Sequence, residues 1–183
     1  MYPPLQALDF MSPAYQQQSQ LGLSKVGMVE FWLLYVQGHI RNKQYLLQNK
    51  HVPRDVLQNY ASSTLDKSLL IKRSLFNRTD LQEETMDNYN RSVWEEIKDI
   101  FLNPYFAPLV AKDFQGLPKT FVFTGFRDVL CDDGTWYAEA LKKANVNVTH
   151  YHHETAYHAL LWTKRKKFLS IYEHVVQYIK NNF

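Results

Sequence analysis

A strand-helix-strand pattern in residues 123–158 constrains the fold more than any other stretch of the chain. The stretch reads FTGFRDVLCDDGTWYAEALKKANVNVTHYHHETAYH, in which one apolar run ends at Asp128 and a second is followed by His158. Alternation of this kind is typical of α/β folds with a parallel sheet. In open sheets of that class, the chemistry lies at the carboxyl ends of the strands. The pattern therefore predicts an α/β fold with an acid and a base at one sheet edge.

The elements of this half are predicted from the spacing of its apolar residues. We expect a strand at 120–124 that is buried on both faces, a helix at 134–143 and a second strand at 146–151. A helix over 168–179 repeats apolar side chains every three or four positions and is expected to cover the sheet. Besides these two strands only an apolar stub at 1–7 is strand-like, whereas an average sheet has about five or six strands. The chain is therefore expected to form part of a larger sheet.

The residues upstream of this half favour helices. Ser24 is suited to cap a helix at 25–37, which is apolar almost all round and ends at Gly38. Such a helix is either buried on most sides or covers a lipophilic cavity, and plain core packing explains it as well as a substrate lid does. The other expected elements are short helices at 41–49, at 53–61 with Pro53 in its first turn, and at 93–102, with a polar, less regular stretch at 63–92.

Length and composition bound the function classes. A chain of 183 residues suits one domain, and its 21 basic and 18 acidic residues are dispersed, so nucleic acid is not an expected partner. No apolar run approaches the roughly 18 to 20 residues of a membrane helix, and the start at Met1 lacks the features of a signal peptide. We expect no cofactor and no membrane span, and the sequence leaves the oligomeric state open. Sequons at Asn77, Asn90 and Asn147 matter only if the chain enters a secretory lumen.

The spacing of the polar residues leaves their roles open. An acid after a strand is commonly a helix cap or a loop former, and a loop histidine is usually solvated. Asp128 could therefore have only a structural role, and His158 could simply be exposed to solvent. Asp132 and Asp133 stand at a helix start, where negative charge interacts well with the helix dipole, and we expect only that role for them.

Metal binding and cysteine chemistry are weak alternatives. On a strand, His150 and His152 point to one face and His153 to the other, so a three-histidine site needs an unusual bend and we expect no metal. Cys131 is the only cysteine, which excludes an internal disulfide. Its position just after the acid is wrong for a nucleophile, and we expect it to pack in the interior.

Four longer stretches carry a family resemblance: TFVFTGFRDVLCDDGTWYAEALKKANVNVTHYHHETAYHALL, YPPLQALDFMSPAYQQQSQLGLSK, MVEFWLLYV and NKHVP. They are similar to the arylacetamide deacetylase family, in the hormone-sensitive-lipase-like branch of the α/β-hydrolases, and their distribution indicates that the similarity extends over essentially the whole chain. The resemblance implies that Asp128 is the acid and His158 the base of a catalytic triad. It also implies a partial α/β-hydrolase fold: residues 1–10 end a core strand and enter the cap, 11–103 form a helical cap, and 104–183 form the C-terminal part of the core.

The chain also departs from that family. The family's HGGG-like oxyanion motif and GDSAGG-like nucleophile elbow have no counterpart here, no G-x-S-x-G occurs, and Ala159 follows the histidine where the family has glycine. The resemblance thus implies a fragment of a serine carboxylesterase or amide hydrolase for lipophilic esters or amides, inactive by itself. The alternative is a truncated relative that serves as an interaction module or has no function. The family further implies the lumenal side of the endoplasmic reticulum membrane, although the chain shows no targeting signal.

Overall fold

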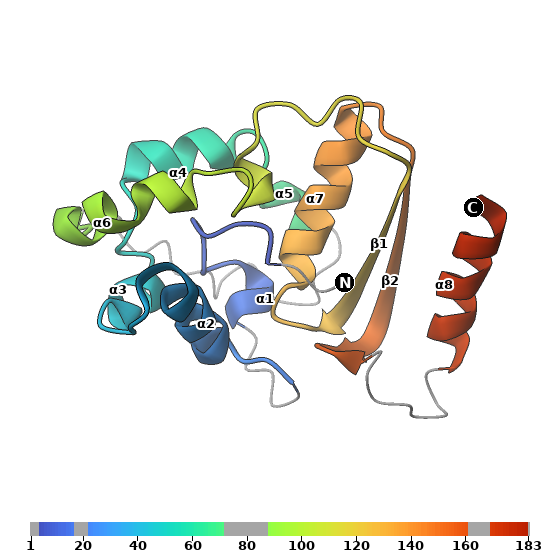
Figure 1. The fold of residues 1–183 in the computed structure, drawn as a ribbon, viewed down its shortest axis with the longest axis horizontal. Helices are drawn as coiled ribbons and strands as arrows, with labels where there is room; N and C mark the ends of the chain where they lie inside the picture. Colours follow the sequence, from blue (N-terminus) through green and yellow to red (C-terminus); the bar gives the residue numbers. More distant parts are fainter. Residues whose placement is uncertain (1–3, 17–21, 72–87, 161–168, 183) are drawn as a thin grey trace.

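The computed structural model has a sheet of two parallel strands with one helix on each face (Figure 1). Strand β1 (Thr120–Arg127) pairs with β2 (Val148–Tyr157), and helix α7 (Cys131–Lys143) connects them. The last helix, α8 (Leu169–Asn182), lies on the opposite face of the sheet from α7. The structure describes residues 4–16, 22–71, 88–160 and 169–182. The predicted α/β class is confirmed, and the two-strand sheet is consistent with a partial α/β-hydrolase fold.

Each of the two helices packs on the sheet through a specific contact. On the α7 side, a Cβ atom at Gly134 would lie 2.5 Å from Thr124 Cγ2, so this glycine lets the helix approach β1 closely. On the α8 side, the ring of Tyr178 lies 4.9 Å from that of Phe121, and His174 stacks on Tyr151 at 4.3 Å. The expectation that the last helix covers the sheet is confirmed from residue 169 onward, and its predicted first residue lies outside the described ranges.

The predicted bounds of the unit are corrected at several ends. Both strands extend further toward their carboxyl ends than predicted, with a register irregularity between Gly125 and Arg127, and α7 begins at Cys131. The prediction that β1 is buried on both faces is wrong, because residues 120–123 are only half-buried. Within the described part of the chain, β1 has a single neighbouring strand, and one missing neighbour leaves a strand partly open to solvent.

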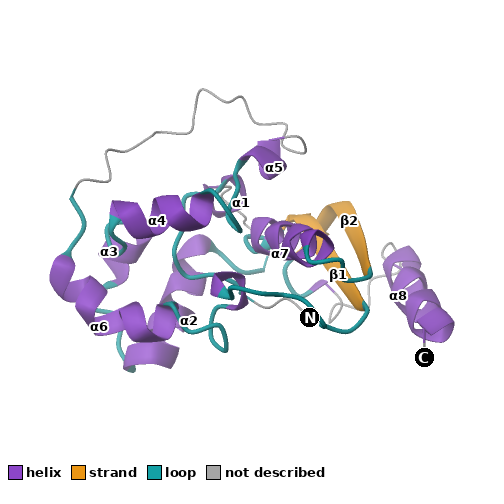
Figure 2. Ribbon diagram, turned by 90° about the horizontal axis from the view of Figure 1, so that it is seen from above, coloured by secondary structure: helices purple, strands orange, loops and turns teal. Residues whose placement is uncertain are grey.

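The remaining helices form a helical group on the side of α7 that faces away from the sheet (Figure 2), and their buried side chains share one hydrophobic core with those of α7. These helices are α1 (Pro13–Gln16), α2 (Lys25–Gln37), α3 (Lys43–Leu47), α4 (Arg54–Ala61), α5 (Ser68–Ile71) and α6 (Arg91–Phe101), followed by a 3-10 turn, η2 (Pro108–Val110). The predicted start and stop of α2 are confirmed, since Ser24 Oγ accepts from the Gly27 amide and Gly38 adopts φ 68°. Among the described residues, no helix has the length and apolar character needed to cross a bilayer.

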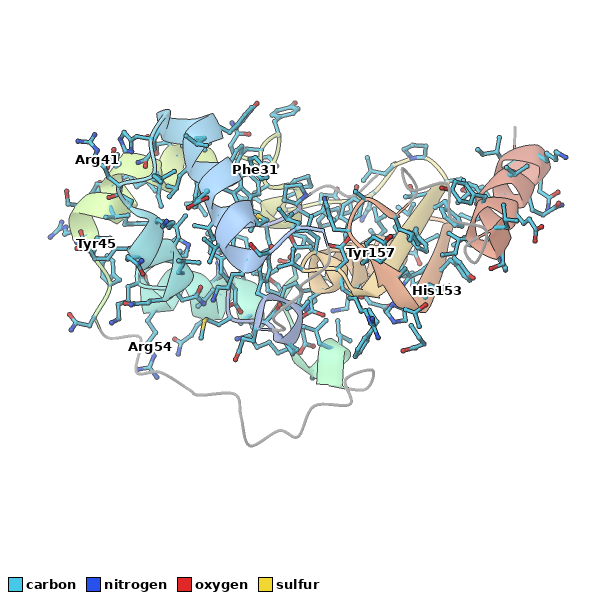
Figure 3. All side chains as sticks on the ribbon, turned by 90° about the horizontal axis from the view of Figure 1, so that it is seen from below. Phe31, Arg41, Tyr45, Arg54, His153 and Tyr157 are labelled. Atoms are coloured by element: carbon cyan, nitrogen blue, oxygen red, sulfur yellow. The ribbon has the colours of Figure 1, made fainter. Side chains whose placement is uncertain are left out.

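Three predictions for this helical group need correction. Pro53 is the N-cap residue of α4 rather than part of its first turn, and α6 begins at Arg91 with Asn90 as its cap. Helix α2 buries only one face, leaving Phe31 at 66% and Tyr35 at 81% exposure; Figure 3 labels Phe31 on this helix. Neighbouring helices contact α2 from one side, which the composition of the helix cannot reveal.

Residues 4–10 cross the interior between the helical group and α7 without forming a strand. Every residue from Leu5 to Phe10 is buried. Residues 4–10 contain no strand here, and the role of residues 1–10 as the end of a core strand in a larger sheet stays a prediction. The backbone groups of this stretch bond to side chains instead of to a neighbouring strand, which removes the need for one.

Candidate functional site

Asp128 and His158 meet at the carboxyl end of the sheet. Asp128 directly follows β1, His158 directly follows β2, and the last paired residues of the two strands are Arg127 and Tyr157. The parallel register therefore brings together two side chains that are 30 residues apart in sequence. Nδ1 of His158 lies 3.1 Å from Oδ1 and 3.2 Å from Oδ2 of Asp128. The structure thus forms the acid-base contact that the sequence pattern predicts.

The surroundings of this pair determine which ring nitrogen carries the proton. The side chain of Asp128 is 4% exposed and that of His158 is 21% exposed, so the contact is largely shielded from water. A second donor, the Leu130 amide, lies 2.9 Å from Oδ1 of Asp128 and fixes the carboxylate. An ionised carboxylate only accepts hydrogen bonds, so Nδ1 is the donor and the neutral ring carries its lone pair on Nε2. That tautomer is the one a general base requires.

The turn after the histidine holds an alanine in an unfavourable conformation. Ala159 has φ 58°, in the left-handed region where the Cβ of an L-residue crowds its own backbone. The sequence places alanine here where the resembling family has glycine, and the structure shows that the position still adopts the backbone conformation that glycine prefers. The alanine therefore costs conformational free energy at this position. The sequence shows the replacement of glycine, but only the structure shows the backbone strain that results.

His150, His152 and His153 lie on β2, and Cys131 lies at the start of α7. His150 Nε2 and His152 Nδ1 both lie 2.9 Å from Thr124 Oγ1, which confirms that they share one face, whereas His153 lies near Tyr151 on the other face. A hydroxyl has one proton, so Thr124 donates to one ring and accepts from the other. Cys131 is buried, with its Sγ 4.0 Å from His152 Nδ1. Among the described residues, no three metal-binding side chains converge.

Asp132 and Asp133 bind the N-terminal segment, a role that the sequence analysis missed. Asp133 is fully buried in the first turn of α7, and it accepts hydrogen bonds from the Leu5 amide at 3.0 Å, Gln6 Nε2 at 3.1 Å and the Tyr15 hydroxyl at 3.2 Å. Asp132 accepts from the amide of Ala14 at 2.8 Å. Asp133 thus replaces a backbone partner that a strand would have given the Leu5 amide, and Asp132 binds an amide in the first turn of α1.

Burial shapes the ionisation of these two carboxyls. Removal from water raises the pKa of Asp133 to about 7, although the hydrogen bonds from Leu5, Gln6 and Tyr15 favour the ionised form and oppose the shift. Burial also raises the pKa of Asp132. The hydroxyl of Tyr15 is affected in turn, since burial and the nearby Asp133 carboxyl raise its pKa. The contact is therefore sensitive to proton concentration near neutral pH.

Side chains from the helical group hold the rest of the segment. His51 is fully buried, and its Nε2–H donates to the Ala7 carbonyl at 3.0 Å; burial lowers the pKa of His51 to about 4, so the ring is neutral at pH 7. Asn49 accepts from the Phe10 amide and donates to Asp9. The sequence signal for this network was a pair of polar residues inside an apolar stretch, QALDF, together with the NKHVP motif.

The chain is similar in sequence to known hydrolases. A family model described as alpha/beta hydrolase fold matches residues 40–162, a range that contains both members of the acid-base pair. Mouse neutral cholesterol ester hydrolase 1 is 34% identical over 165 residues, covering 88% of this chain and 40% of its own length. Bovine arylacetamide deacetylase is 35% identical over 175 residues, covering 90% and 41%. The chain thus spans about two fifths of these relatives. An alpha/beta hydrolase from the metagenome of Lake Arreo, Spain, is 32% identical over 39% of this chain and 23% of its own, with a TM-score of 0.36.

Proposed function

Because the chain belongs to the α/β-hydrolase fold family, alongside arylacetamide deacetylase and neutral cholesterol ester hydrolase, we propose that it supplies two members of a serine-hydrolase triad. Asp128 is the acid and His158 is the base. The observation that carries this proposal is the contact of 3.1 Å between His158 Nδ1 and Asp128 at the carboxyl ends of adjacent parallel strands.

The reaction that this pair supports is acyl transfer. Nε2 of His158 accepts the proton of a serine hydroxyl while the serine oxygen attacks the carbonyl carbon of an ester or amide. The resulting imidazolium then returns the proton to the leaving group. Asp128 keeps the proton on Nδ1 before the attack and stabilises the positive ring after it. A water molecule, activated by the same nitrogen, releases the acid from the acyl-enzyme.

The serine and the oxyanion donors are proposed to come from sequence outside these 183 residues. The chain contains no G-x-S-x-G motif, which is how this fold presents a nucleophilic serine. Loss of a single oxyanion donor alone costs about 3 to 4 kcal/mol of transition-state stabilisation. We therefore expect the 183 residues by themselves to be inactive toward esters.

The proposed substrates are carboxylic esters or amides with a lipophilic group. The support comes from the relatives, whose names specify a cholesterol ester and an arylacetamide. Both are carbonyl compounds in which a large apolar group lies next to the bond that is cleaved, and both suit an acid-base pair acting with serine.

A serine-reactive probe tests the proposal. The chain is joined to the N-terminal part of arylacetamide deacetylase, and the product is treated with a fluorophosphonate and assayed on a chromogenic ester. We expect labelling and turnover in the joined protein, neither in the 183 residues alone, and loss of both when the serine of the added part is replaced by alanine. Labelling of the 183 residues alone would contradict the proposal. A joined protein that melts cooperatively but is not labelled would favour the interaction-module alternative.

We also propose that the chain resides on the lumenal side of the endoplasmic reticulum. Asn147, in the sequon Asn-Val-Thr, is exposed just before β2, where an oligosaccharide can be attached without disturbing the core. Expression in the lumen should give a protein whose electrophoretic mobility increases after glycosidase treatment, and the shift should disappear in Asn147→Gln. If glycosidase treatment leaves the mobility unchanged, Asn147 carries no glycan and the proposal loses its support.

A further inference from the structure

Gly22 contacts the backbone of His158. A Cβ atom added to Gly22 would lie 2.9 Å from the carbonyl oxygen of His158 and 3.1 Å from its Cβ. Cβ atoms essentially never lie within 3.0 Å of a heavy atom of another segment, so a side chain at position 22 would force one of the two segments to move. Because Gly22 shortly precedes Ser24, the N-cap of α2, the contact joins the start of the helical group to the histidine.

Backbone conformation alone does not explain this glycine. Gly22 has φ +85°, but Gly38 and Gly116 have similar values of +68° and +72°, and a Cβ at either of those positions would meet nothing within 4 Å. All three glycines permit a left-handed turn. Only Gly22 combines that turn with close packing, and the packing partner is His158.

We propose that Gly22 is a positioning residue that sets the place of the His158 ring; this inference rests on the proposed role of His158 as the base. The ring is fixed at two points: Nδ1 by Asp128, and Cβ together with the carbonyl by Gly22. The turn beyond it carries backbone strain, since Ala159 adopts φ 58° against the preference of its side chain. Contact with Gly22 therefore opposes a shift of the strained turn away from Asp128.

A pair of matched variants separates positioning from folding. Gly22→Ala and Gly38→Ala impose a similar backbone strain, but only the first adds a clash with His158. We expect Gly22→Ala to shift or remove the low-field NMR resonance of the His158 Nδ1 proton in the full chain. In the joined protein it should lower kcat about 100-fold, the loss typical of a misplacement of about 1 Å, with little change in KM. Gly38→Ala should leave the resonance, kcat and KM unchanged.

A rescue variant and a direct measurement keep the inference testable if Gly22→Ala folds poorly. Adding Ala159→Gly to Gly22→Ala relaxes the turn and should restore part of the lost kcat. In the unchanged chain, a nuclear Overhauser effect is expected between the α protons of Gly22 and the β protons of His158. An unperturbed His158 resonance in folded Gly22→Ala, or the absence of that Overhauser effect, would overturn the inference. Neither measurement needs a substrate, so their outcome is independent of whether the joined protein turns over an ester.

Discussion

Asp128 and Asp133 are two buried carboxyls near the start of one helix, and they serve different purposes. Asp128 is 4% exposed and pairs with the His158 imidazole, a group that can take up a proton and become positively charged. Asp133 is fully buried and, in the part of the chain that the structure describes, accepts hydrogen bonds from three neutral donors, namely the Leu5 amide, Gln6 Nε2 and the Tyr15 hydroxyl. Burial is nearly the same for both. The difference teaches that the partner, rather than the depth of burial, decides whether a carboxyl suits chemistry or structure.

The two carboxyls also differ in what they hold together. Asp128 and His158 join two neighbouring strands within a single strand-helix-strand unit. Asp133 joins α7 to a segment 128 residues earlier, and through it to His51 and the helical group. Removal of Asp128 is therefore expected to change the reaction, and removal of Asp133 to change the stability of the fold.

The largest expected effect belongs to the first carboxyl. Asp128→Asn should lower kcat of the joined protein about 10,000-fold, because the amide can hold the ring in the wrong tautomer and cannot stabilise the imidazolium. Its free energy of unfolding, measured with urea, should change by less than about 1 kcal/mol, since the shape is kept and a hydrogen bond to the ring remains. A kcat within tenfold of the unchanged protein would remove Asp128 from the proposed triad.

Replacement of Asp133, the second carboxyl, should mainly lower the stability of the fold. Asp133→Ala leaves the Leu5 amide, Gln6 Nε2 and the Tyr15 hydroxyl without their buried acceptor, and it is expected to lower the free energy of unfolding by about 4 kcal/mol. Urea unfolding of the full chain measures this loss. The control is Asp99→Ala, an exposed acid on α6, which should change stability by less than about 0.5 kcal/mol. Equal stability in the two variants would show that Asp133 does not anchor the segment.

The pH dependence of stability should distinguish the second carboxyl further. The pKa of Asp133 is raised from 3.8 to about 7 in the folded state, so the folded state binds the extra proton and stability is lost as pH rises from 4 to 7. His51 acts in the opposite sense, since its pKa is lowered to about 4, and the neighbouring Asp132 adds to the effect of Asp133. Comparison with Asp133→Asn isolates the Asp133 contribution.

The expected size follows from the shift of the Asp133 pKa. The stability of the unchanged chain minus that of Asp133→Asn should fall by on the order of 3 kcal/mol between pH 4 and pH 7, and then level off. Urea unfolding at several pH values measures the difference. A difference that stays constant would mean that the hydrogen bonds to Asp133 balance its burial, and one that rises with pH would mean that they outweigh it; either result would contradict the raised pKa.

What the sequence predicts well depends on neighbours that are close along the chain. The caps of α2, Ser24 and Gly38, were predictable because capping involves residues within one turn. The contact between Asp128 and His158 was predictable because parallel register within one strand-helix-strand unit aligns the strand ends. Local rules and the topology of one unit suffice for both features.

What the sequence could not predict depends on distant partners. The role of Asp133 requires knowing that Leu5 packs against α7, and nothing in the local pattern of either stretch indicates it. The exposure of Phe31 and Tyr35 likewise depends on which side of α2 the other helices occupy. Strand β2 was predicted too short because its end is polar, while pairing with β1 extends it to Tyr157.

The smallest expected effect concerns the turn after His158, the residue that pairs with Asp128. Ala159→Gly removes the strain of a left-handed alanine, about 1 to 2 kcal/mol, but gives the unfolded chain more freedom, which costs about 0.5 to 1 kcal/mol. The net gain in stability should be about 0.5 kcal/mol, measured as a small rise in the urea midpoint. Asn145→Gly, at φ 59° after α7, is the control and should gain less, because asparagine adopts this conformation readily. A loss of stability in Ala159→Gly would show that contacts of the alanine methyl group hold the turn. The turn after His158 would then be as firmly packed as the segment that Asp133 binds.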